Sequence, residues 1–466
     1  MTTDIARRID ALLGAGRALT DDASRAARRR DEWVRSHLDD GSLRAPACVV
    51  RPRSTAEVAA VVRACIDLGQ PVVPYGLGSG VCGAFRPTAD AVVIDLGAMT
   101  AVRALDPADL LATFEAGVRG DDAERAVAAH GLTLGHSPQS LGISTVGGWV
   151  ATRSAGQGST RYGGIERMLL GLEVVLPSGE VLVTNASPRS STGPDLDALF
   201  LGSEGALGVI TAVTLSLRRV PAARVGTSFR PASLADGLGL LAELAQRGVA
   251  APVTRLYDPV EVARHFAAAT TGEALLILLH EGDPGVIAAE VAACRAAASA
   301  RSILEGDPGL AEAWRARRYE APSFAELVAS GLFFDTIEVA ARWSALPGLY
   351  ARVVRDVGAV PGVFAVSAHA SHVYPSGASL YFTFGGRAAG GLDRPTLYDR
   401  AWRAAMEAAV DCGATIAHHH GVGRVRLPWL RRELGDAGVD ALAAIRRALD
   451  PKGLMNPGAL APGEAP

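Results

Sequence analysis

The stretch Pro138-Gln-Ser-Leu-Gly-Ile-Ser-Thr-Val-Gly-Gly148 concentrates hydroxyl side chains and glycines in one short segment. Two further loops share this character, Gly76-Leu-Gly-Ser-Gly80 with Gly83 shortly after it, and Gly202-Ser-Glu-Gly-Ala-Leu-Gly208. Each lies beside a short apolar segment, which predicts a strand next to the loop. Consecutive backbone N–H groups in such loops form a nest for anions, and glycine lets phosphate oxygens approach closely. Together the loops predict one long phosphate-bearing ligand, wrapped by the N-terminal half.

The first loop also invites a dinucleotide interpretation, because Gly76-x-Gly78-x-Gly80 follows an apolar strand. A lone glycine triplet is weak evidence, since a tight turn gives the same pattern. A nicotinamide site would also need the loop to open a helix whose N-terminus faces the pyrophosphate. The sequence continues instead as Gly83-Ala-Phe-Arg-Pro87, and the proline interrupts a helix there. This disfavours a Rossmann site, whereas a loop without a helix can still hold a pyrophosphate.

The composition indicates a globular enzyme of more than one domain. The chain has 466 residues, of which 49% are hydrophobic and 20% charged, so it has enough apolar surface for several cores. No apolar run reaches the ~18 residues of a membrane span, and the charges within residues 1–17 argue against a secretory signal. The net charge of −3 gives no support for a nucleic-acid or anionic-membrane surface. The 5 cysteines contain no Cys-x-x-Cys pair, which predicts a reducing, cytoplasmic location and no disulfide framework or structural zinc site.

The change of residue pattern along the chain predicts four segments. Residues 1–45 have polar helical character, residues 46–220 alternate strands with glycine turns, residues 221–410 form a cap, and residues 411–466 complete the active site and pack on the N-terminal half. In the cap, Ala/Leu-rich helices alternate with strands, which is typical of an antiparallel sheet with helices on one side. The expected helices are Ser233–Gln246, Pro284–Ala300 and Trp343–Val357, and the expected strands are Ala274–Leu279, Leu332–Val339 and Leu380–Gly385.

Three consecutive histidines, His418-His419-His420, precede Gly421-Val-Gly423. The stretch Ala414–His420 has strand character, and side chains alternate along a strand, so we expect His418 and His420 to share one face while His419 opposes them. From the residues alone, a metal-binding pair and a polar loop both remain open for this triplet.

Several loop segments carry a family resemblance. These are Pro74–Gly83, Gln139–Thr145, Thr152–Ala155, Tyr162-Gly163 and Glu204–Ile210, together with Ser191-Thr-Gly-Pro-Asp195 and the ending Asp450–Gly458. They resemble the FAD-contacting and neighbouring segments of the vanillyl-alcohol-oxidase/PCMH flavoproteins, in particular the alkyldihydroxyacetonephosphate synthase branch. The resemblance covers roughly residues 45–460. It implies an α+β fold with a PCMH-type two-part FAD-binding domain and an antiparallel-sheet cap of the FAD-linked oxidase C-terminal type.

The resemblance implies FAD as the cofactor, held noncovalently as in the synthase branch. Some relatives attach the flavin to a His or Cys, and His136 and Cys82 lie near the first two loops. A loop histidine and a small buried cysteine are the simpler interpretation of these two residues. The residues expected to bind FAD are Pro74, Gly76, Leu77, Gly78, Ser79, Gly80, Gly83, Gln139, Ser140, Ser144, Thr145, Gly148, Thr152, Arg153, Ser154, Ala155, Tyr162, Gly163, Glu204, Gly205, Gly208, Val209 and Ile210.

The resemblance also implies catalytic residues. The synthase branch has the same triple histidine, which serves in general acid–base catalysis and substrate contact, so His418, His419 and His420 are expected to do so here. Tyr381 matches the tyrosine that the family places near flavin N5, and Arg255 matches an arginine that orders the site. Taken alone, the tyrosine would pack in a core and the arginine would lie along the surface. The pairing of Tyr381 with the histidines favours a functional role.

One position departs from the synthase pattern. The synthases place an active-site arginine after an Ala-Pro pair, where it holds the anionic substrate, whereas this chain reads Ala321-Pro322-Ser-Phe-Ala325 with alanine at that place. Loss of a bidentate phosphate clamp removes strong charge-assisted hydrogen bonds. Arg315, Arg317 and Arg318 lie upstream and are expected to form a solvated helix face.

We therefore expect an FAD-dependent oxidoreductase that acts on a small hydroxylated substrate, a hydroxy acid or an alcohol, by hydride transfer to flavin N5. One alternative is alkylglycerone-phosphate synthase, in which the flavin forms an N5 adduct and no net oxidation occurs. Another is a catalytically degenerate flavin-binding module. A small molecule is the expected partner, and the Ala/Leu-rich cap helices fit a homodimer interface as well as an internal core.

No catalytic metal is expected. The related D-2-hydroxyacid dehydrogenases bind a divalent metal through two His and one Glu, but this chain has Tyr381 and His419 at two of those places. His369 and His372 lie nearby, yet an incomplete ligand set does not make a metal site.

Overall fold

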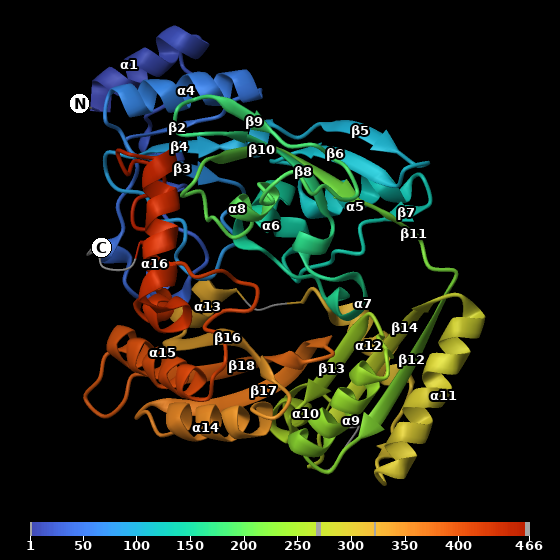
Figure 1. Ribbon diagram of the computed structural model, residues 1–466. Helices are drawn as coiled ribbons and strands as arrows, with labels where there is room; N and C mark the ends of the chain where they lie inside the picture. Colours follow the sequence, from blue (N-terminus) through green and yellow to red (C-terminus); the bar gives the residue numbers. More distant parts are fainter. Residues whose placement is uncertain (1, 267–271, 321–322, 462–466) are drawn as a thin grey trace.

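The computed structural model describes residues 2–266, 272–320 and 323–461. Figure 1 shows an N-terminal half stacked on a cap that contains the largest sheet, with the helix α16 (Leu430–Leu449) running back along the N-terminal half. Across the described ranges, none of the helices combines the length and the hydropathy that a bilayer span requires.

The N-terminal half contains two main sheets, which confirms the expected two-part architecture. The first consists of β1 (Ala18–Leu19), β2 (Cys48–Val50), β4 (Val92–Asp95) and β3 (Val72–Tyr75), in this order. Its strands β2, β4 and β3 run parallel. The second is antiparallel and consists of β5 (Val102–Asp106), β6 (Leu111–Glu115), β10 (Val209–Ser216), β8 (Leu169–Val175) and β9 (Val181–Val183), in this order.

Short helices connect and cover these strands. They are α1 (Thr2–Leu13), α2 (Asp22–Ala26), α3 (Val34–Leu38), α4 (Thr55–Asp67), α5 (Gly120–Ala128), α6 (Val146–Thr152), α7 (Ser159–Tyr162) and α8 (Asp197–Phe200). The pattern of Ser54 and Glu57 predicts a capping box at the start of α4. Half of it forms: Ser54 Oγ accepts from Glu57 N at 3.2 Å, but the Glu57 carboxylate accepts from Arg53 N and pairs with Arg17.

The cap is built on an antiparallel sheet of seven strands, as the sequence predicts. In spatial order they are β15 (Leu304–Glu305), β12 (Ala223–Arg230), β14 (Leu275–Gly282), β13 (Val253–Tyr257), β17 (Val363–Tyr374), β18 (Gly377–Arg387) and β16 (Leu332–Arg342). The expected helices form as α9 (Leu234–Gln246), α11 (Pro284–Ala300) and α14 (Leu346–Gly358). The sequence prediction misses β17, because serines and histidines at alternate positions hide its hydrophobic pattern.

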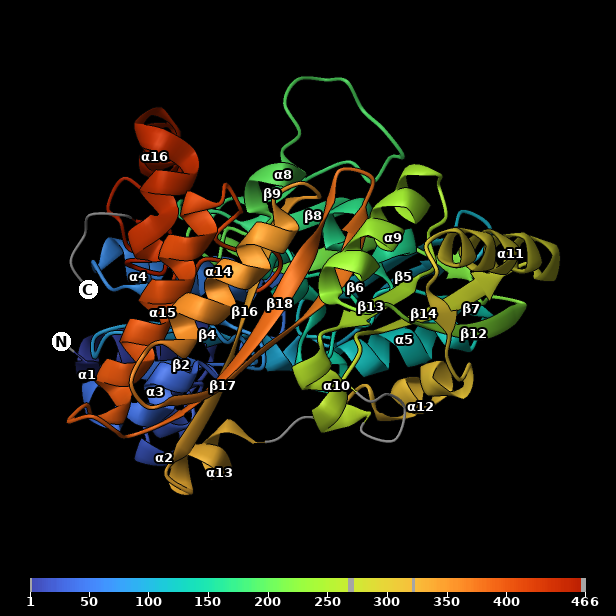
Figure 2. The ribbon, with the colours of Figure 1, turned by 90° about the horizontal axis from the view of Figure 1, so that it is seen from below.

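Helices cover both faces of the cap sheet, so the expectation of helices on one side is wrong. Helices α9 and α14 lie across the outer face (Figure 2) and share one core with Leu276 and Leu278 of β14. The alternate residues Leu275 and Ile277 pack instead against Ala311 of α12 (Gly309–Arg317) on the inner face. A buried strand such as β14 is apolar at every position, and its two faces can therefore each hold a helix.

The chain after α15 (Arg394–Asp411) forms an irregular loop where the strand Ala414–His420 was expected. The backbone N–H groups of His419 and His420 donate to the Glu338 carboxylate, at 3.3 and 2.9 Å, and not to a neighbouring strand. Without the strand, the alternation of the three histidines does not hold. After α16, Met455 pairs with Val72 of β3, which joins the C-terminal segment to the N-terminal half.

Candidate active site

The three glycine-rich loops lie side by side. A Cβ on Gly76 of the first loop would come within 2.5 Å of Thr145 Oγ1 in the second, and a Cβ on Gly205 of the third would lie 3.0 Å from Pro74 of the first. Two backbone hydrogen bonds of 2.9 Å join the third loop to α6, the helix that begins in the second loop: Gly202 N donates to Val150 O, and Glu204 N donates to Ala151 O. The loops therefore form one continuous cradle.

The first loop offers donors that suit a pyrophosphate. Among the described residues, the backbone N–H groups of residues 76–80 have no acceptor. Gly78 has φ +70°, a conformation that L side chains rarely adopt, so the loop needs glycine at this turn. Backbone donors without protein acceptors in a glycine loop are what an anion nest requires, and they fit the phosphates of FAD.

We expect Gly76→Ala to weaken FAD binding on the order of tenfold, because the added methyl group would push the first two loops apart. Fluorescence titration of the apoprotein with FAD measures the dissociation constant. Gly348→Ala in α14 is the matched control, since a Cβ there meets nothing within 4 Å. Equal affinity of Gly76→Ala and the wild type would contradict the cradle.

Several hydroxyl groups of the second loop bond within the loop itself. Ser144 Oγ donates to Ser140 O and accepts from Trp149 Nε1, both at 2.8 Å. Thr145 Oγ1 accepts from Gly148 N at 3.2 Å and caps α6. These contacts shape the loop, and direct binding of FAD by these side chains stays a prediction.

Neither candidate for covalent flavin attachment is open to the surface. His136 is 1% exposed, and its Nε2 lies 3.0 Å from Ser154 Oγ. Burial lowers the pKa of His136 to about 3. Cys82 is 1% exposed, and its Sγ accepts a 2.6 Å hydrogen bond from Arg426. These contacts support our proposal that FAD is held noncovalently.

Glu204 of the third loop contacts the triple-histidine loop. Its carboxylate accepts from Val422 N at 2.7 Å and from Gly423 N at 2.9 Å. Gly421 and Gly423 both have positive φ, and a Cβ on Gly423 would lie 2.1 Å from Cys82 O. Glycine is therefore required where the histidine loop docks on the first and third loops of the cradle.

One row of side chains crosses four strands of the cap. The strand register places Tyr257 of β13, His369 of β17, Tyr381 of β18 and Glu338 of β16 directly beside one another. Register partners in an antiparallel sheet share a face, so the row lies on the inner face, opposite the outer core. Ser159 of α7 contacts His372 on this face, which brings the N-terminal half against the row.

Tyr381 is the member of this row whose ring faces the histidine loop. Its ring stacks on His369 with centroids 4.9 Å apart and lies 6.1 Å from the ring of His419. The hydroxyl donates to Thr336 Oγ1 at 3.0 Å. Burial raises the pKa of Tyr381, so the phenol stays protonated at neutral pH.

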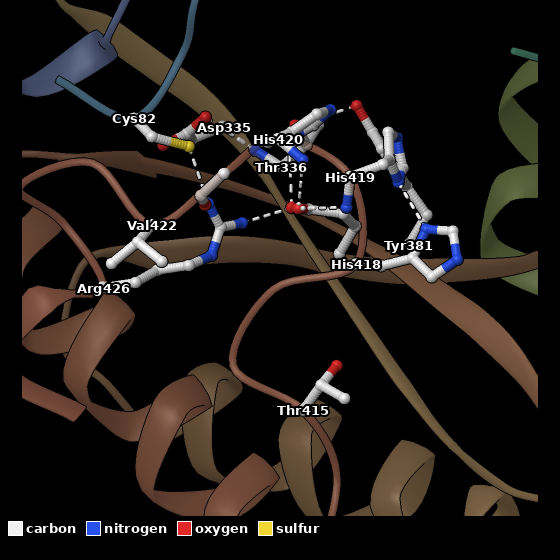
Figure 3. A network of polar contacts seen from close by, with 12 residues as sticks. Cys82, Asp335, Thr336, Tyr381, Thr415, His418, His419, His420, Val422 and Arg426 are labelled. Atoms are coloured by element: carbon white, nitrogen blue, oxygen red, sulfur yellow. Dashed lines mark hydrogen bonds and ion pairs between the residues drawn. The ribbon is translucent and has the colours of Figure 1, made fainter. Parts of the chain in front are cut away.

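A buried ion pair, Glu338 with Arg426, contacts the histidine loop; Figure 3 shows Arg426 and the three histidines of this network. The side chains of Glu338 and Arg426 are each 0% exposed and bond directly to one another. His420 Nδ1 lies 3.0 Å from the same carboxylate. Burial is the largest single influence and opposes the charge on Glu338, but Arg426 and the histidine loop together outweigh it and hold the pKa of Glu338 well below its usual range.

His418 and His419 are linked ring to ring. The two Nδ1 atoms lie 2.7 Å apart, and His418 Nε2 lies 2.7 Å from the hydroxyl oxygen of Tyr374 at the end of β17. Burial lowers the pKa of His418 to about 4 and that of His419 well below its usual value. Both rings are therefore neutral at pH 7.

Arg255 reaches the row through His369. Arg255 Nη1 lies 2.7 Å from His369 Nε2, and His369 Nδ1 lies 2.9 Å from the Glu261 carboxylate. A guanidinium can only donate hydrogen bonds, so His369 Nε2 accepts from Arg255. The ring proton of His369 is then on Nδ1, which donates a hydrogen bond to the Glu261 carboxylate. The guanidinium also lies over the Trp314 ring, 5.4 Å from its centroid.

His372, His418 and His419 have ring nitrogens within 4.8 Å of one another, a spacing that a metal ion accepts. However, His372 Nδ1 bonds to Ser159, and His418 uses both of its nitrogens in the contacts above. We keep the proposal of no catalytic metal and expect chelator-washed holoenzyme to contain far less than one zinc or manganese per chain by elemental analysis. One equivalent of either metal, retained after washing, would contradict this.

The position of the missing synthase arginine is exposed. Ala325 is exposed on α13 (Phe324–Ala329), while Ala321 and Pro322 lie outside the described residues. Upstream, Arg315 pairs with Glu312 and Arg317 pairs with Glu320, as expected of a solvated helix face. Arg318 donates to Arg315 O and lies over the Tyr319 ring.

Models of two domain families match this chain. The model described as an FAD binding domain matches residues 46–185, and the model described as the C-terminal domain of FAD linked oxidases matches residues 220–460, which is more than half of the chain. The chain belongs to the FAD-linked oxidases. It is an FAD-dependent enzyme, as its loops predict.

Relatives of this FAD-linked oxidase include proteins with different reactions. It is 29% identical to the alkyldihydroxyacetonephosphate synthase of Trypanosoma brucei brucei, over 93% of this chain and 76% of that protein. It is 27% identical to the glycolate oxidase subunit GlcD of Bacillus subtilis (strain 168), over 89% and 88%. A solved structure of alkyldihydroxyacetonephosphate synthase superposes with a TM-score of 0.80 at 24% identity, covering 98% of this chain and 84% of that chain, and shows the same fold.

Sequence reasoning missed the residues that support the predicted ones. Glu338, Arg426, Glu261 and Tyr374 each contact a predicted catalytic residue or its neighbour. One signal was available: Glu338 is a charge inside the apolar run of β16, and buried charges are almost always paired. Its partner Arg426 is 88 residues away and carries no local signal.

Proposed function

We propose that this enzyme oxidises the hydroxyl-bearing carbon of a small hydroxy acid or alcohol by hydride transfer. The observation that carries the proposal is the placement of Tyr381 beside a histidine loop that docks on the FAD cradle through Glu204. Bound FAD supplies the hydride acceptor. The chain's own residues bind and orient the substrate and move its hydroxyl proton.

We assign the base to His419. A neutral imidazole can accept the hydroxyl proton, and burial keeps His419 neutral. Tyr381 stays protonated and can hold the substrate oxygen by a hydrogen bond. Arg255, oriented by His369, supplies positive charge on the inner face of the sheet, which favours a carboxylate-bearing substrate.

Two observations support a hydroxy acid as the substrate. Alanine at position 325 lacks the phosphate-holding arginine of the synthase pattern. The Bacillus subtilis relative is named for glycolate, which is a 2-hydroxy acid.

Anaerobic mixing of the holoenzyme with a panel of D- and L-2-hydroxy acids and alcohols tests the proposal. We expect at least one member to bleach the flavin absorbance and to give the corresponding oxo product. A panel in which no member reduces the flavin, while dithionite does, would contradict the proposal.

A second candidate is alkylglycerone-phosphate synthesis, in which no net oxidation occurs. The triple histidine followed by Gly-x-Gly and the similarity to the trypanosome synthase favour it. Exchange of the acyl chain of acyl-dihydroxyacetone phosphate for a fatty alcohol, without flavin bleaching, would identify this reaction. A protein that binds FAD but performs neither reaction would be a degenerate flavin-binding module.

A further inference from the structure

A continuous chain of hydrogen bonds leads from the histidine loop toward the surface. It runs from His419 Nδ1 to His418 Nδ1 at 2.7 Å, and from His418 Nε2 to the Tyr374 hydroxyl at 2.7 Å. Tyr374 is only partly buried, at the end of β17. The charged groups that act on it are Glu166, Arg167 and Arg153 of the N-terminal half, and both arginines are exposed. The inner end of the chain, His419, lies beside Tyr381.

The two neutral rings allow this chain two hydrogen-bond directions. In one, His419 Nδ1–H donates to His418 Nδ1, and His418 Nε2–H donates to the Tyr374 oxygen. In the other, the Tyr374 hydroxyl donates to His418 Nε2, and His418 Nδ1–H donates to His419 Nδ1. Each direction places one proton on every ring, so neither requires a charged group. A chain that can reverse without leaving a donor or acceptor unpaired is what proton conduction requires.

We propose that His419, His418 and Tyr374 form a proton relay between the flavin side of the active site and solvent, an inference that rests on the function proposed above. A proton arriving at His419 Nε2 is matched by transfer of the Nδ1 proton of His419 to His418 Nδ1. The Nε2 proton of His418 then passes to the Tyr374 oxygen, which releases its own proton to water. One proton enters and one leaves, and the three groups are neutral before and after.

The surroundings fix the relay in place. Glu338 accepts from the backbone N–H groups of His419 and His420, and Glu204 holds the Gly-Val-Gly turn that follows. Burial raises the pKa of Tyr374 to about 12, so its hydroxyl keeps a proton to release. By contrast, the Tyr398 hydroxyl donates to the Asp335 carboxylate at 2.6 Å and accepts from Trp33 Nε1, and both of these partners are buried.

Tyr374→Phe removes the outer end of the relay and changes little volume. Tyr350→Phe is the matched control, because Tyr350 is a partly buried tyrosine of the cap that donates one hydrogen bond, to Asp258. The reaction to follow is the re-oxidation of chemically reduced holoenzyme by ferricyanide, since it releases a proton from the flavin side and needs no substrate. Its outcome therefore does not depend on whether the hydroxy-acid panel succeeds.

We expect Tyr374→Phe to slow the proton-dependent phase on the order of tenfold, with a raised solvent deuterium isotope effect, and added imidazole to restore the rate. Tyr350→Phe should behave as the wild type. His418→Gln, which can still hydrogen-bond but cannot pass a proton between two ring nitrogens, should reproduce the loss. A rate of Tyr374→Phe within about twofold of the wild type, or a loss that imidazole does not restore, overturns the relay.

A second readout does not involve turnover. In ¹⁵N-histidine NMR of the holoenzyme, we expect Tyr374→Phe to change the tautomer populations of both His418 and His419, although of these two rings it is His418 that bonds to the Tyr374 hydroxyl. Unchanged His419 signals would show that the two rings are not coupled and would overturn the proposal. If Tyr374→Phe does not fold, the rate of re-oxidation and its restoration by imidazole are measured on His418→Gln and decide in the same way.

Discussion

The variant Arg426→Met is expected to lose about 3–5 kcal/mol of unfolding free energy, because it leaves the buried Glu338 carboxylate without its positive partner. Both side chains are 0% exposed, so water cannot replace the lost interaction. The Cys82 thiol and the Gly421 carbonyl would lose hydrogen bonds from the same guanidinium. Urea unfolding of the holoenzyme at neutral pH, followed by circular dichroism, measures the difference.

The matched control is Arg432→Met. Arg432 pairs with Glu407 and Asp411, but all three side chains are well exposed, so we expect a loss of at most about 1 kcal/mol. A double variant, Arg426→Met with Glu338→Leu, should recover part of the stability, since it removes the unpaired buried charge. The recovery should be incomplete, because the backbone N–H groups of His419 and His420 lose their acceptor. Similar losses in Arg426→Met and Arg432→Met would contradict the assigned role of the buried pair.

The loss in Arg426→Met should depend on pH. In the wild type, Arg426 holds the pKa of Glu338 low, against the effect of burial. Without Arg426, burial is opposed only by the contacts of the carboxyl with the histidine loop, so we expect its pKa to rise. The variant should therefore be least stable at neutral and higher pH, and its deficit should shrink as the pH falls and Glu338 takes up a proton.

Tyr381→Phe is expected to lower the rate of substrate-driven flavin reduction by about a hundredfold, because the substrate oxygen loses its hydrogen-bond partner at the reacting centre. The affinity for FAD should stay unchanged, since the cradle loops do not include Tyr381. Anaerobic stopped-flow absorbance measures the rate, with the substrate identified by the panel. Tyr350→Phe again serves as the control for loss of a tyrosine hydroxyl in the cap.

Two outcomes would separate the possible roles of Tyr381. A higher KM with an unchanged limiting rate would mean that the hydroxyl only helps to bind substrate in the ground state. Turnover of Tyr381→Phe equal to that of the wild type would show that Tyr381 has no part in the mechanism. It would favour a protein that binds flavin without catalysis at this site.

The FAD-binding half of the active site could be predicted from the sequence because its chemistry is local. The three glycine-rich loops together predict a phosphate-bearing ligand, because each can expose its backbone N–H groups, whichever strands surround it. Helices with strong local signals also formed where expected, such as Pro284–Ala300, where Asp283 caps the start and proline occupies the first turn.

The catalytic half could be predicted only in part. The triple histidine and Tyr381 were identified, but the strand expected at residues 414–420 does not form. Thr415 N–H still donates to Ala340 O of β16, whereas the N–H groups of His419 and His420 bond to the Glu338 carboxylate. Strand β17 was missed, although it carries His369, His372 and Tyr374. Its polar residues face the active site, so its hydrophobic pattern is weak although it lies in the middle of the sheet.

The amino-acid order alone was enough to predict a flavin cradle and a division into a cofactor half and a cap, and to single out the central histidines and Tyr381 as candidates for catalysis. It was not enough to show that Tyr257, His369, Tyr381 and Glu338 stand in one row, or that Arg426 neutralises Glu338. Those relations depend on strand register and on contacts between residues far apart in the chain. Hydrophobic periodicity and turn chemistry act over a few residues, so such contacts leave no trace in any local stretch of sequence.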